Sequence, residues 1–220
     1  MTQVGNIARL RQGLYRFFGG ALSHPGDEEF ATLRAAGDVL QTFPIADFAY
    51  FGAWRRFQRA LAGIPTATSL DAEYVRLFAS GTDGALCPPI ESFYVAKAEG
   101  GGIADTVATL QRTYHELGLR WLDAEAPDHI ATELNVLSTL CGREADGWAA
   151  DDARAAVRDL RRQNLFLRLH VLAWFTQFAD RVRSASPDGF YALVVDAVDA
   201  FLTHDYDWTR ALIERVEVEA

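Results

Sequence analysis

The chain has 220 residues, of which half are hydrophobic and 23% are charged. That length and composition suit a globular protein that buries a core of its own. Its formal net charge of −9 argues against binding to nucleic acid or to anionic lipid, because both partners normally attract basic surfaces. A basic peptide or basic protein surface is the partner that this charge favours.

No segment of the sequence shows the pattern that is typical of a targeting signal or a membrane span. The first twenty residues lack the continuous apolar core of a signal peptide. The most apolar later run, residues 165–178, is interrupted by polar side chains and is shorter than the roughly 20 residues that span a bilayer. Cys87 and Cys141 are far apart and form no CxxC. We therefore expect a cytoplasmic protein without disulfides and without stable membrane insertion.

Apolar residues recur at the three-to-four-residue spacing of buried helix faces in almost every part of the chain. No convincing alternating strand pattern is present, so we predict an all-α fold, a single globular bundle of about ten helices. Prolines stand where helices can begin, and Gly118 and Gly142 stand where helices can end. The apolar stripes lie within residues 7–18, 48–61, 70–78, 107–114, 130–137, 165–175 and 190–201.

Two segments are predicted to be non-helical. Residues 80–102 are rich in glycine and proline yet carry apolar side chains, which is typical of a functional loop. Residues 143–151 form a short polar link. We predict one domain over residues 1–220, in which an N-terminal portion (1–142) and a C-terminal portion (151–220) pack together.

The predicted helix that follows Pro127 carries polar residues at its start. Asp128 in the first turn is favoured by the helix dipole. His129 and Glu133 are four residues apart and so share a face of the helix. Ordinary dipole compensation explains this cluster as well as function does. The functional interpretation is the acidic end of a groove, which would bind guanidinium groups through paired hydrogen bonds. His129 and Glu133 supply at most half of a metal site, so no metal is expected.

The helix over residues 70–79 leads into the Pro88–Pro89 loop. Tyr74, Leu77 and Phe78 at its end either pack in the core or line an apolar trough for a peptide. Catalytic signatures are missing: no phosphate loop, nucleophile elbow or zinc-ligand spacing occurs. The glycines at 100–102 lack the lysine and the strand of a phosphate loop, and we interpret them as a joint.

Five motifs in this order resemble the TorD/DmsD/NarJ family of redox-enzyme maturation chaperones. They are DAEYVRLF (71–78), PPIESFY (88–94), PDHIATEL (127–134), FLRLHVLAWFTQF (166–178) and FYALVVDAVDAFL (190–202). Each motif alone is weak, but their order across residues 5–215 is specific. One departure concerns the glutamate that often precedes Pro-Asp-His directly, because Ala126 here separates Glu125 from Pro127.

The resemblance implies a TorD-like helical chaperone without enzymatic activity or cofactor. Its partner would be the catalytic subunit of a molybdopterin oxidoreductase of the DMSO-reductase type, bound as apoenzyme or through its twin-arginine signal peptide until the cofactor is inserted. A nucleotide-binding or nucleotide-hydrolysing assembly factor and a structural subunit of the oxidoreductase are the alternatives. The oligomeric state is left open between monomer and dimer. The predicted peptide-binding residues are Tyr74, Leu77, Phe78, Pro88, Pro89, Glu91, Asp128, His129, Glu133 and Trp174.

Overall fold

The computed structural model describes residues 3–40, 51–79, 84–99, 102–120 and 126–219. These residues form ten α-helices and one π-helical turn, so the prediction of an all-α fold is confirmed. The elements are α1 (Gln3–Ala21), α2 (Asp27–Leu40), α3 (Phe51–Gly63), α4 (Thr68–Phe78), α5 (Glu91–Glu99), α6 (Ile103–Glu116), α7 (Ile130–Ala149), α8 (Ala153–Phe166), η2 (Leu167–Val171), α9 (Leu172–Ala185) and α10 (Phe190–Glu219).

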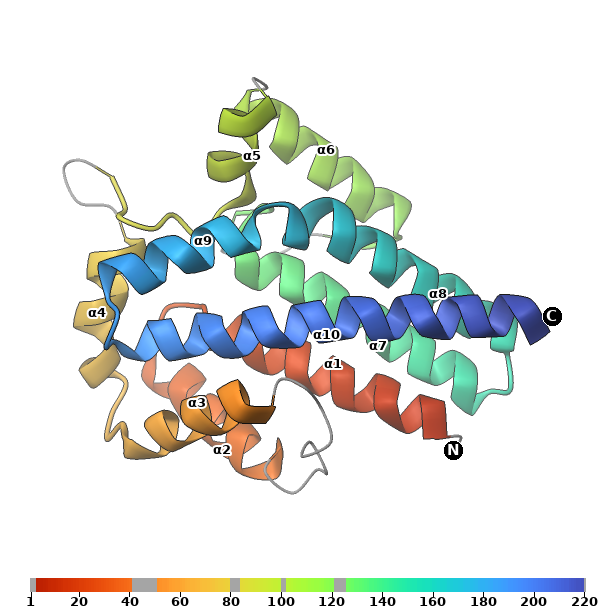
Figure 1. Cartoon of the computed structure of the whole chain (residues 1–220), viewed down its shortest axis with the longest axis horizontal. Helices are drawn as coiled ribbons and strands as arrows, with labels where there is room; N and C mark the ends of the chain where they lie inside the picture. The colour runs from red at the N-terminus through yellow and green to blue at the C-terminus, as the bar shows by residue number, and fades with distance from the viewer. Residues whose placement is uncertain (1–2, 41–50, 80–83, 100–101, 121–125, 220) are drawn as a thin grey trace.

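The long helices lie side by side around a shared core (Figure 1). Helix α1 packs along α7, α7 packs along α8, and α10 contacts α3, α4, α8 and α9. Elements α8, η2 and α9 follow one another without a break and run antiparallel to α10. Helices α5 and α6 cover one side of this bundle, while α2 and α3 cover the opposite side.

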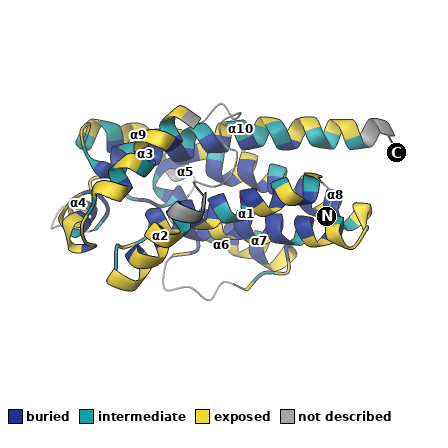
Figure 2. Cartoon of the chain, turned by 90° about the horizontal axis from the view of Figure 1, so that it is seen from below, coloured by how far each residue is buried: buried dark blue, intermediate teal, exposed yellow. Residues whose placement is uncertain are grey.

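Aromatic side chains fill the core where α1, α3 and α10 meet. Trp54 of α3 contacts Phe17 and Phe18 of α1 edge to face, at ring distances of 5.4 and 5.7 Å. Phe201 of α10 lies 5.5 Å from Phe18. Helices α1 and α7 are mostly buried, whereas the C-terminal half of α10 is largely half-buried or exposed (Figure 2). The apolar stripes predicted from the sequence therefore face one common interior.

A buried polar network ties α1 to three other helices. The Arg11 guanidinium contacts Asp205 of α10 (2.5 Å), Glu144 of α7 (2.8 Å) and Gln163 of α8 (2.6 Å). Tyr15 donates a further hydrogen bond to Asp205 (2.6 Å). Because each of these side chains has charged or polar partners, the network satisfies the condition under which charge is tolerated in a core.

The prediction of a polar link over residues 143–151 is wrong for most of that span. Helix α7 continues to Ala149, and the turn into α8 takes only the next few residues. Gly142 does not end a helix either. It lies within α7, and a Cβ there would meet only the end of the Gln12 side chain of α1, 2.7 Å from its Nε2. The polar residue Glu144 is fully buried against Arg11, so polarity here marks an internal ion pair.

The predicted loop over residues 80–102 contains helix α5, which is a second correction. Gly118, by contrast, follows the end of α6 in the left-handed conformation (φ 67°), as predicted for a helix stop. Both Cys87 and Cys141 are buried free thiols. None of the helices described has the length and hydropathy needed to cross a bilayer. The division into two portions stays a prediction.

Candidate functional site

The candidate site lies where the segment before α5 meets the start of α7. Ile90 and His129 form an isolated antiparallel bridge. The backbone N–H of Glu91 donates to the carbonyl of Asp128 (2.8 Å), and that of Ile130 donates to the carbonyl of Pro89 (2.9 Å). Two sequence motifs that are about forty residues apart are thus held side by side by main-chain hydrogen bonds.

Side chains cap both helix starts at this junction. The Asp128 carboxylate accepts the backbone N–H of Ser92 in the first turn of α5 (3.3 Å). His129 is the N-cap of α7, and its Nδ1 accepts the backbone N–H of Ala131 (3.2 Å). Asp128 therefore precedes α7 instead of lying in its first turn as predicted, and it stabilises the neighbouring helix.

Three carboxyl groups gather inside this junction. Glu91, Asp128 and Glu133 are exposed by 3%, 3% and 0% respectively. Burial is the main cause that raises the pKa of Glu133 well above its usual value, and repulsion from Glu91 raises it further. The environment of Glu133 therefore favours its protonated form more strongly than an exposed position would.

The hydrogen bonding of Glu133 is incomplete. Its Oε2 accepts a hydrogen bond from Trp174 Nε1 of α9 (3.2 Å). Among the described residues, its buried Oε1 accepts no hydrogen bond, and the Ser92 Oγ and the Tyr94 hydroxyl on α5 have no partner either. The carboxyl group of Glu91 is close enough to share a hydrogen bond with a protonated Glu133. An unpaired buried polar atom costs about 1–3 kcal/mol, so these atoms make the junction a candidate functional site.

Residues of η2 and α9 form the opposite wall of the junction. His170 Nδ1 lies 3.3 Å from both carboxylate oxygens of Glu91. The Trp174 ring stacks on Tyr94 at 5.3 Å. The π-helical turn that holds His170 is of a kind frequently found at functional sites. The wall therefore combines an imidazole with two stacked aromatic rings.

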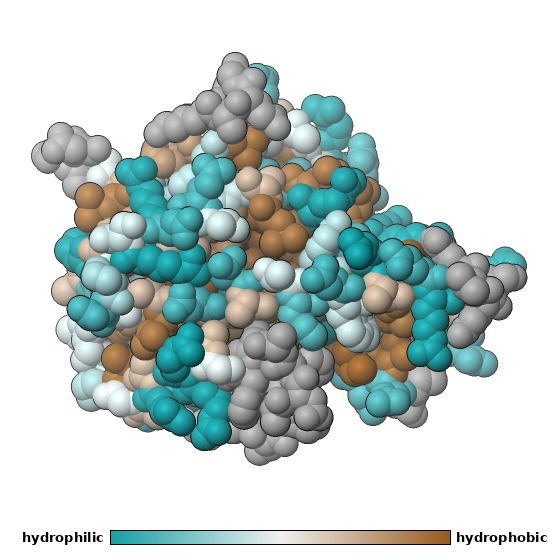
Figure 3. All heavy atoms as spheres, in the orientation of Figure 1, coloured by the Kyte–Doolittle hydropathy of each residue, from teal (hydrophilic) through white to brown (hydrophobic). Residues whose placement is uncertain are grey.

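The apolar half of the predicted groove is closed. Tyr74 and Phe78 pack on Tyr191 of α10, at 5.8 and 5.0 Å, and Leu77 is fully buried. Phe178 lies between Phe78 and the Trp174 ring, at 5.8 and 5.7 Å. Pro89 is buried and Pro88 is half-buried. On the face seen in Figure 3, apolar side chains appear as separate patches between hydrophilic ones.

The structure thus brings together only part of the predicted site. Glu91, Asp128, His129, Glu133 and Trp174 meet at one junction. The aromatic residues of α4 belong to a neighbouring cluster, and Leu77 reaches the segment before α5 through its carbonyl, which accepts the N–H of Cys87 (2.7 Å). Glu125 lies outside the described residues. No group of metal-binding side chains occurs in the part of the chain that the structure describes.

Sequence reasoning missed three residues of this junction: Ser92, Tyr94 and His170. Ser92 and Tyr94 stood inside the quoted PPIESFY motif, which was a usable signal. His170 likewise stood inside the quoted FLRLHVLAWFTQF motif, but its contact with Glu91 joins positions 79 residues apart and was not visible in the sequence.

Comparison with known proteins decides the family. The sequence pattern of the family described as the nitrate reductase delta subunit matches residues 47–180. The chain belongs to this family. The matched span includes α5, the start of α7 and the π-helical turn, and so contains every residue of the junction. The resemblance to the TorD and NarJ chaperones is thereby confirmed.

Relatives of the chain have names that describe chaperones, including a chaperone for reductase assembly. The chain is 29% identical over 153 residues to the chaperone protein TorD of Aeromonas salmonicida, covering 68% of this chain and 65% of that protein. It is 31% identical over 147 residues to the selenate reductase assembly chaperone protein of Thauera selenatis, covering 64% and 72%. These names describe chaperones and not enzymes, which supports the prediction of a non-enzymatic protein.

A solved structure shares the fold of this family member. The crystal structure of a candidate redox enzyme maturation protein from Archaeoglobus fulgidus superposes with a TM-score of 0.50 at 20% identity, covering 94% of this chain and 93% of the other. At that identity the likeness concerns the fold alone.

Proposed function

We propose that this protein is a system-specific cytoplasmic chaperone for a molybdopterin oxidoreductase of the DMSO-reductase family. It binds the twin-arginine signal peptide of the catalytic subunit, or the apoenzyme, and holds it until the cofactor is inserted. The observation that carries the proposal is the junction of α5 and α7, where buried carboxyl groups lie beside stacked aromatic rings and where the Ser92 and Tyr94 hydroxyls have no hydrogen-bond partner among the described residues.

The chemistry of a twin-arginine segment fits this junction. Two adjacent guanidinium groups require carboxylates, and the apolar stretch that follows requires aromatic or aliphatic walls. Glu91, Asp128 and Glu133 supply the first, and Tyr94 with Trp174 supplies the second. The net charge of −9 adds long-range attraction for a basic peptide.

Because the carboxyl groups are buried, binding requires that α5 and the segment before it move away from α7. That movement breaks the main-chain hydrogen bonds and the cap between the two segments, and it separates Glu91 from His170 and Tyr94 from Trp174. Once water enters, the pKa of Glu133 falls towards its usual value and the proton leaves. Peptide binding is therefore coupled to proton release, and the affinity rises with pH as long as Glu133 is protonated in the free protein.

The test is calorimetric titration of the protein with a synthetic twin-arginine peptide. We expect Asp128→Ala and Glu133→Gln to weaken binding by about tenfold or more. A tenfold loss corresponds to roughly 1.4 kcal/mol, which is the order of one lost charged hydrogen bond. Substitutions of Tyr74 or Phe78 serve as the apolar comparison, because any affinity that they remove is insensitive to salt. Thermal melts of each variant separate a binding loss from a folding loss.

A twin-lysine peptide is the matched control, since it keeps the charge and removes the paired geometry of guanidinium. Equal affinity of wild type and both carboxyl variants for the twin-arginine peptide removes the junction from the binding site. Substitutions of Tyr74 or Phe78 that only lower the melting temperature assign those residues to the core.

Two alternatives are tested separately. A nucleotide-binding assembly factor would bind GTP in the same calorimeter, although the sequence contains no phosphate loop. A structural subunit would remain in the purified mature oxidoreductase, whereas a chaperone would be present only with the apoenzyme.

A further inference from the structure

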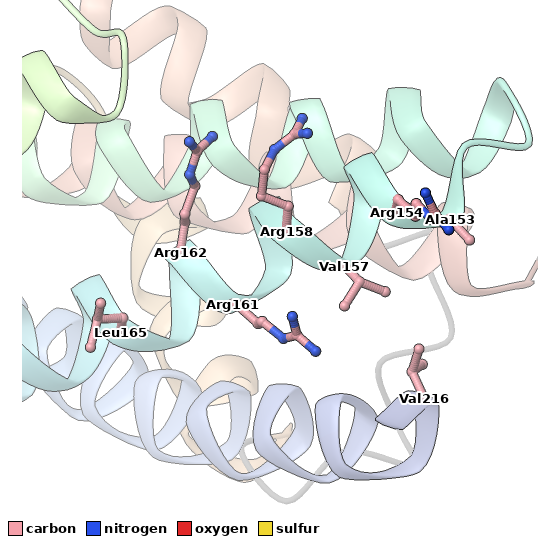
Figure 4. Close-up of a pocket in the computed structure, with 8 residues that line it drawn as sticks. All are labelled: Ala153, Arg154, Val157, Arg158, Arg161, Arg162, Leu165 and Val216. Carbon is pink, nitrogen blue, oxygen red and sulfur yellow. The ribbon is translucent and has the colours of Figure 1, made fainter. Parts of the chain in front are cut away.

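A second surface with a distinct composition lies along α8, next to the C-terminal part of α10 (Figure 4). It encloses a cavity of about 770 Å³. We call it the α8 groove, and it shares no residue with the junction of α5 and α7. Seven residues of α8 and one residue of α10 line it: Ala153, Arg154, Val157, Arg158, Arg161, Arg162, Leu165 and Val216.

The lining of the α8 groove is strongly basic although the whole chain is acidic. Among the described residues, the lining contains four arginines and no carboxylate. Asp159 of α8, which is buried, lies near Arg158 (3.6 Å) and Arg162 (2.9 Å). Two guanidinium groups one helical turn apart thus share one carboxylate. Like charges at that spacing destabilise a helix by a few tenths of a kcal/mol, so added carboxylates would stabilise it.

The floor of the groove is apolar. Val157 and Val216 point towards the gap between the two helices, and Leu165 lies at the end of the groove (Figure 4). Leu165 is 50% exposed, and Leu169, one turn further along the same helical stretch, is also 50% exposed. The apolar strip therefore continues beyond the groove onto the π-helical turn. Basic and apolar positions alternate along about 16 Å of helix, at 1.5 Å per residue.

We propose that the α8 groove is a docking site for an acidic, amphipathic segment of a partner protein. Carboxylates of that segment pair with Arg154, Arg158 and Arg162, and its apolar side chains cover Val157 and Leu165. Paired guanidinium–carboxylate contacts beside an apolar floor combine strength with geometric selectivity.

The arginines of the groove favour a short acidic segment over two other occupants. A second copy of the protein would bring a further charge of −9, and a membrane would present an extended anionic surface to the whole acidic chain. A short segment brings its carboxylates to the arginines, while salt screens its repulsion from acidic groups more than a Debye length away. The extended shape of the groove along three turns of α8 also suits a chain segment better than a single small anion.

The test uses the full-length protein and three labelled peptides of about 18 residues, long enough to form a helix. All three carry the same leucine stripe, and their polar positions are glutamate, glutamine or lysine. Fluorescence anisotropy should show binding of the glutamate peptide that weakens with added salt. The charge-reversal variant Arg158→Glu/Arg162→Glu should weaken it by at least about tenfold, and Leu165→Ser should weaken it by a smaller factor.

The matched control is Arg59→Glu/Arg112→Glu, which makes the same change in net charge at exposed positions outside the groove. It should leave affinity within about twofold, the effect of long-range charge alone. Thermal melts verify that each variant is folded. Equal binding of the glutamate and glutamine peptides, or equal losses in the two double variants, overturns the proposal. Self-association or binding to anionic vesicles that the groove variant abolishes also overturns it, because the occupant would then be a second copy or a membrane.

Discussion

At the scale of single residues, this helical protein has two buried clusters of ionisable groups that differ in how completely they are paired. The network around Arg11 gives each charge a partner from another helix. The cluster around Glu133 includes two hydroxyls, of Ser92 and Tyr94, that have no partner among the described residues, and burial there raises the pKa of the Glu133 carboxyl group. Complete pairing is typical of a structural role, whereas an unpaired, perturbed group is a candidate functional site.

The raised pKa of Glu133 predicts a pH-dependent stability. Its stabilising contribution is complete below the usual glutamate value of 4.5 and is lost as pH rises through the raised value of the folded state, because the unfolded state releases its proton first. Glu133→Gln removes this dependence. The free energy of unfolding in urea of the variant, minus that of the wild-type protein, should therefore increase as pH rises above 4.5. Parallel curves for the two proteins would mean that Glu133 is not protonated in the folded state.

The Arg11 network predicts a large loss of stability on substitution. Arg11→Met leaves the buried carboxylates of Asp205 and Glu144 without their cation, which costs about 3–5 kcal/mol. Arg9→Met is the control, since Arg9 pairs with Asp146 at the surface and an exposed pair contributes only about 0–1 kcal/mol. Denaturant unfolding of both variants measures the difference. Equal losses would show that the buried network contributes no more than a surface pair.

At the scale of elements, the sequence predicted helices wherever an apolar stripe was long and failed where helix formation depends on distant partners. Helix α5 has nine residues between prolines and glycines, and its start is held by main-chain contacts with the segment before α7. The end of α7 is polar because Glu144 pairs with Arg11, 133 positions away. Neither partner is visible in local periodicity. The junction was predictable in its motifs, whereas its closure was not.

Two glycines of α7 test how closely this helix packs against its neighbours. A Cβ at Gly147 would lie 2.8 Å from the backbone nitrogen of Ala156, which cannot move without shifting α8. A Cβ at Gly142 meets only the flexible end of Gln12. Gly147→Ala should therefore lower the free energy of unfolding by about 1–3 kcal/mol, while Gly142→Ala should be neutral or stabilising by up to about 1 kcal/mol. Similar effects in both variants would indicate that α7 and α8 separate easily.

At the scale of the whole molecule, α5 and α6 form a cover on a bundle built from α1, α7, α8 and α10. Helix α5 packs against α6 and α9, whereas α7 packs against α1 and α8 over most of its length. The unpaired atoms of Ser92 and Tyr94 lie on α5. Opening of this cover exposes the junction while the bundle stays folded, and regions of that kind form the low-stability end of a protein.

Hydrogen exchange measured by mass spectrometry tests this separation. Backbone amides of α5 should exchange at least about tenfold faster than those in the middle of α7, because they open locally and not through global unfolding. Addition of a twin-arginine peptide should change the exchange of α5 and leave α1 unaffected. Identical protection of α5 and α7 would mean that the junction opens only when the whole bundle unfolds.

The π-helical turn between α8 and α9 determines how far the side-chain faces of these two helices are rotated relative to each other about their common axis. One extra residue in a continuous helix turns everything beyond it by about 100°, since an α-helix has 3.6 residues per turn. The arginine face of α8 and the Trp174 face of α9 can therefore point in different directions although they belong to one continuous helical stretch. Removal of one residue from the turn would restore a regular helix and rotate Trp174 away from Glu133, so that a change in a few backbone hydrogen bonds would separate the aromatic wall from its carboxyl partner.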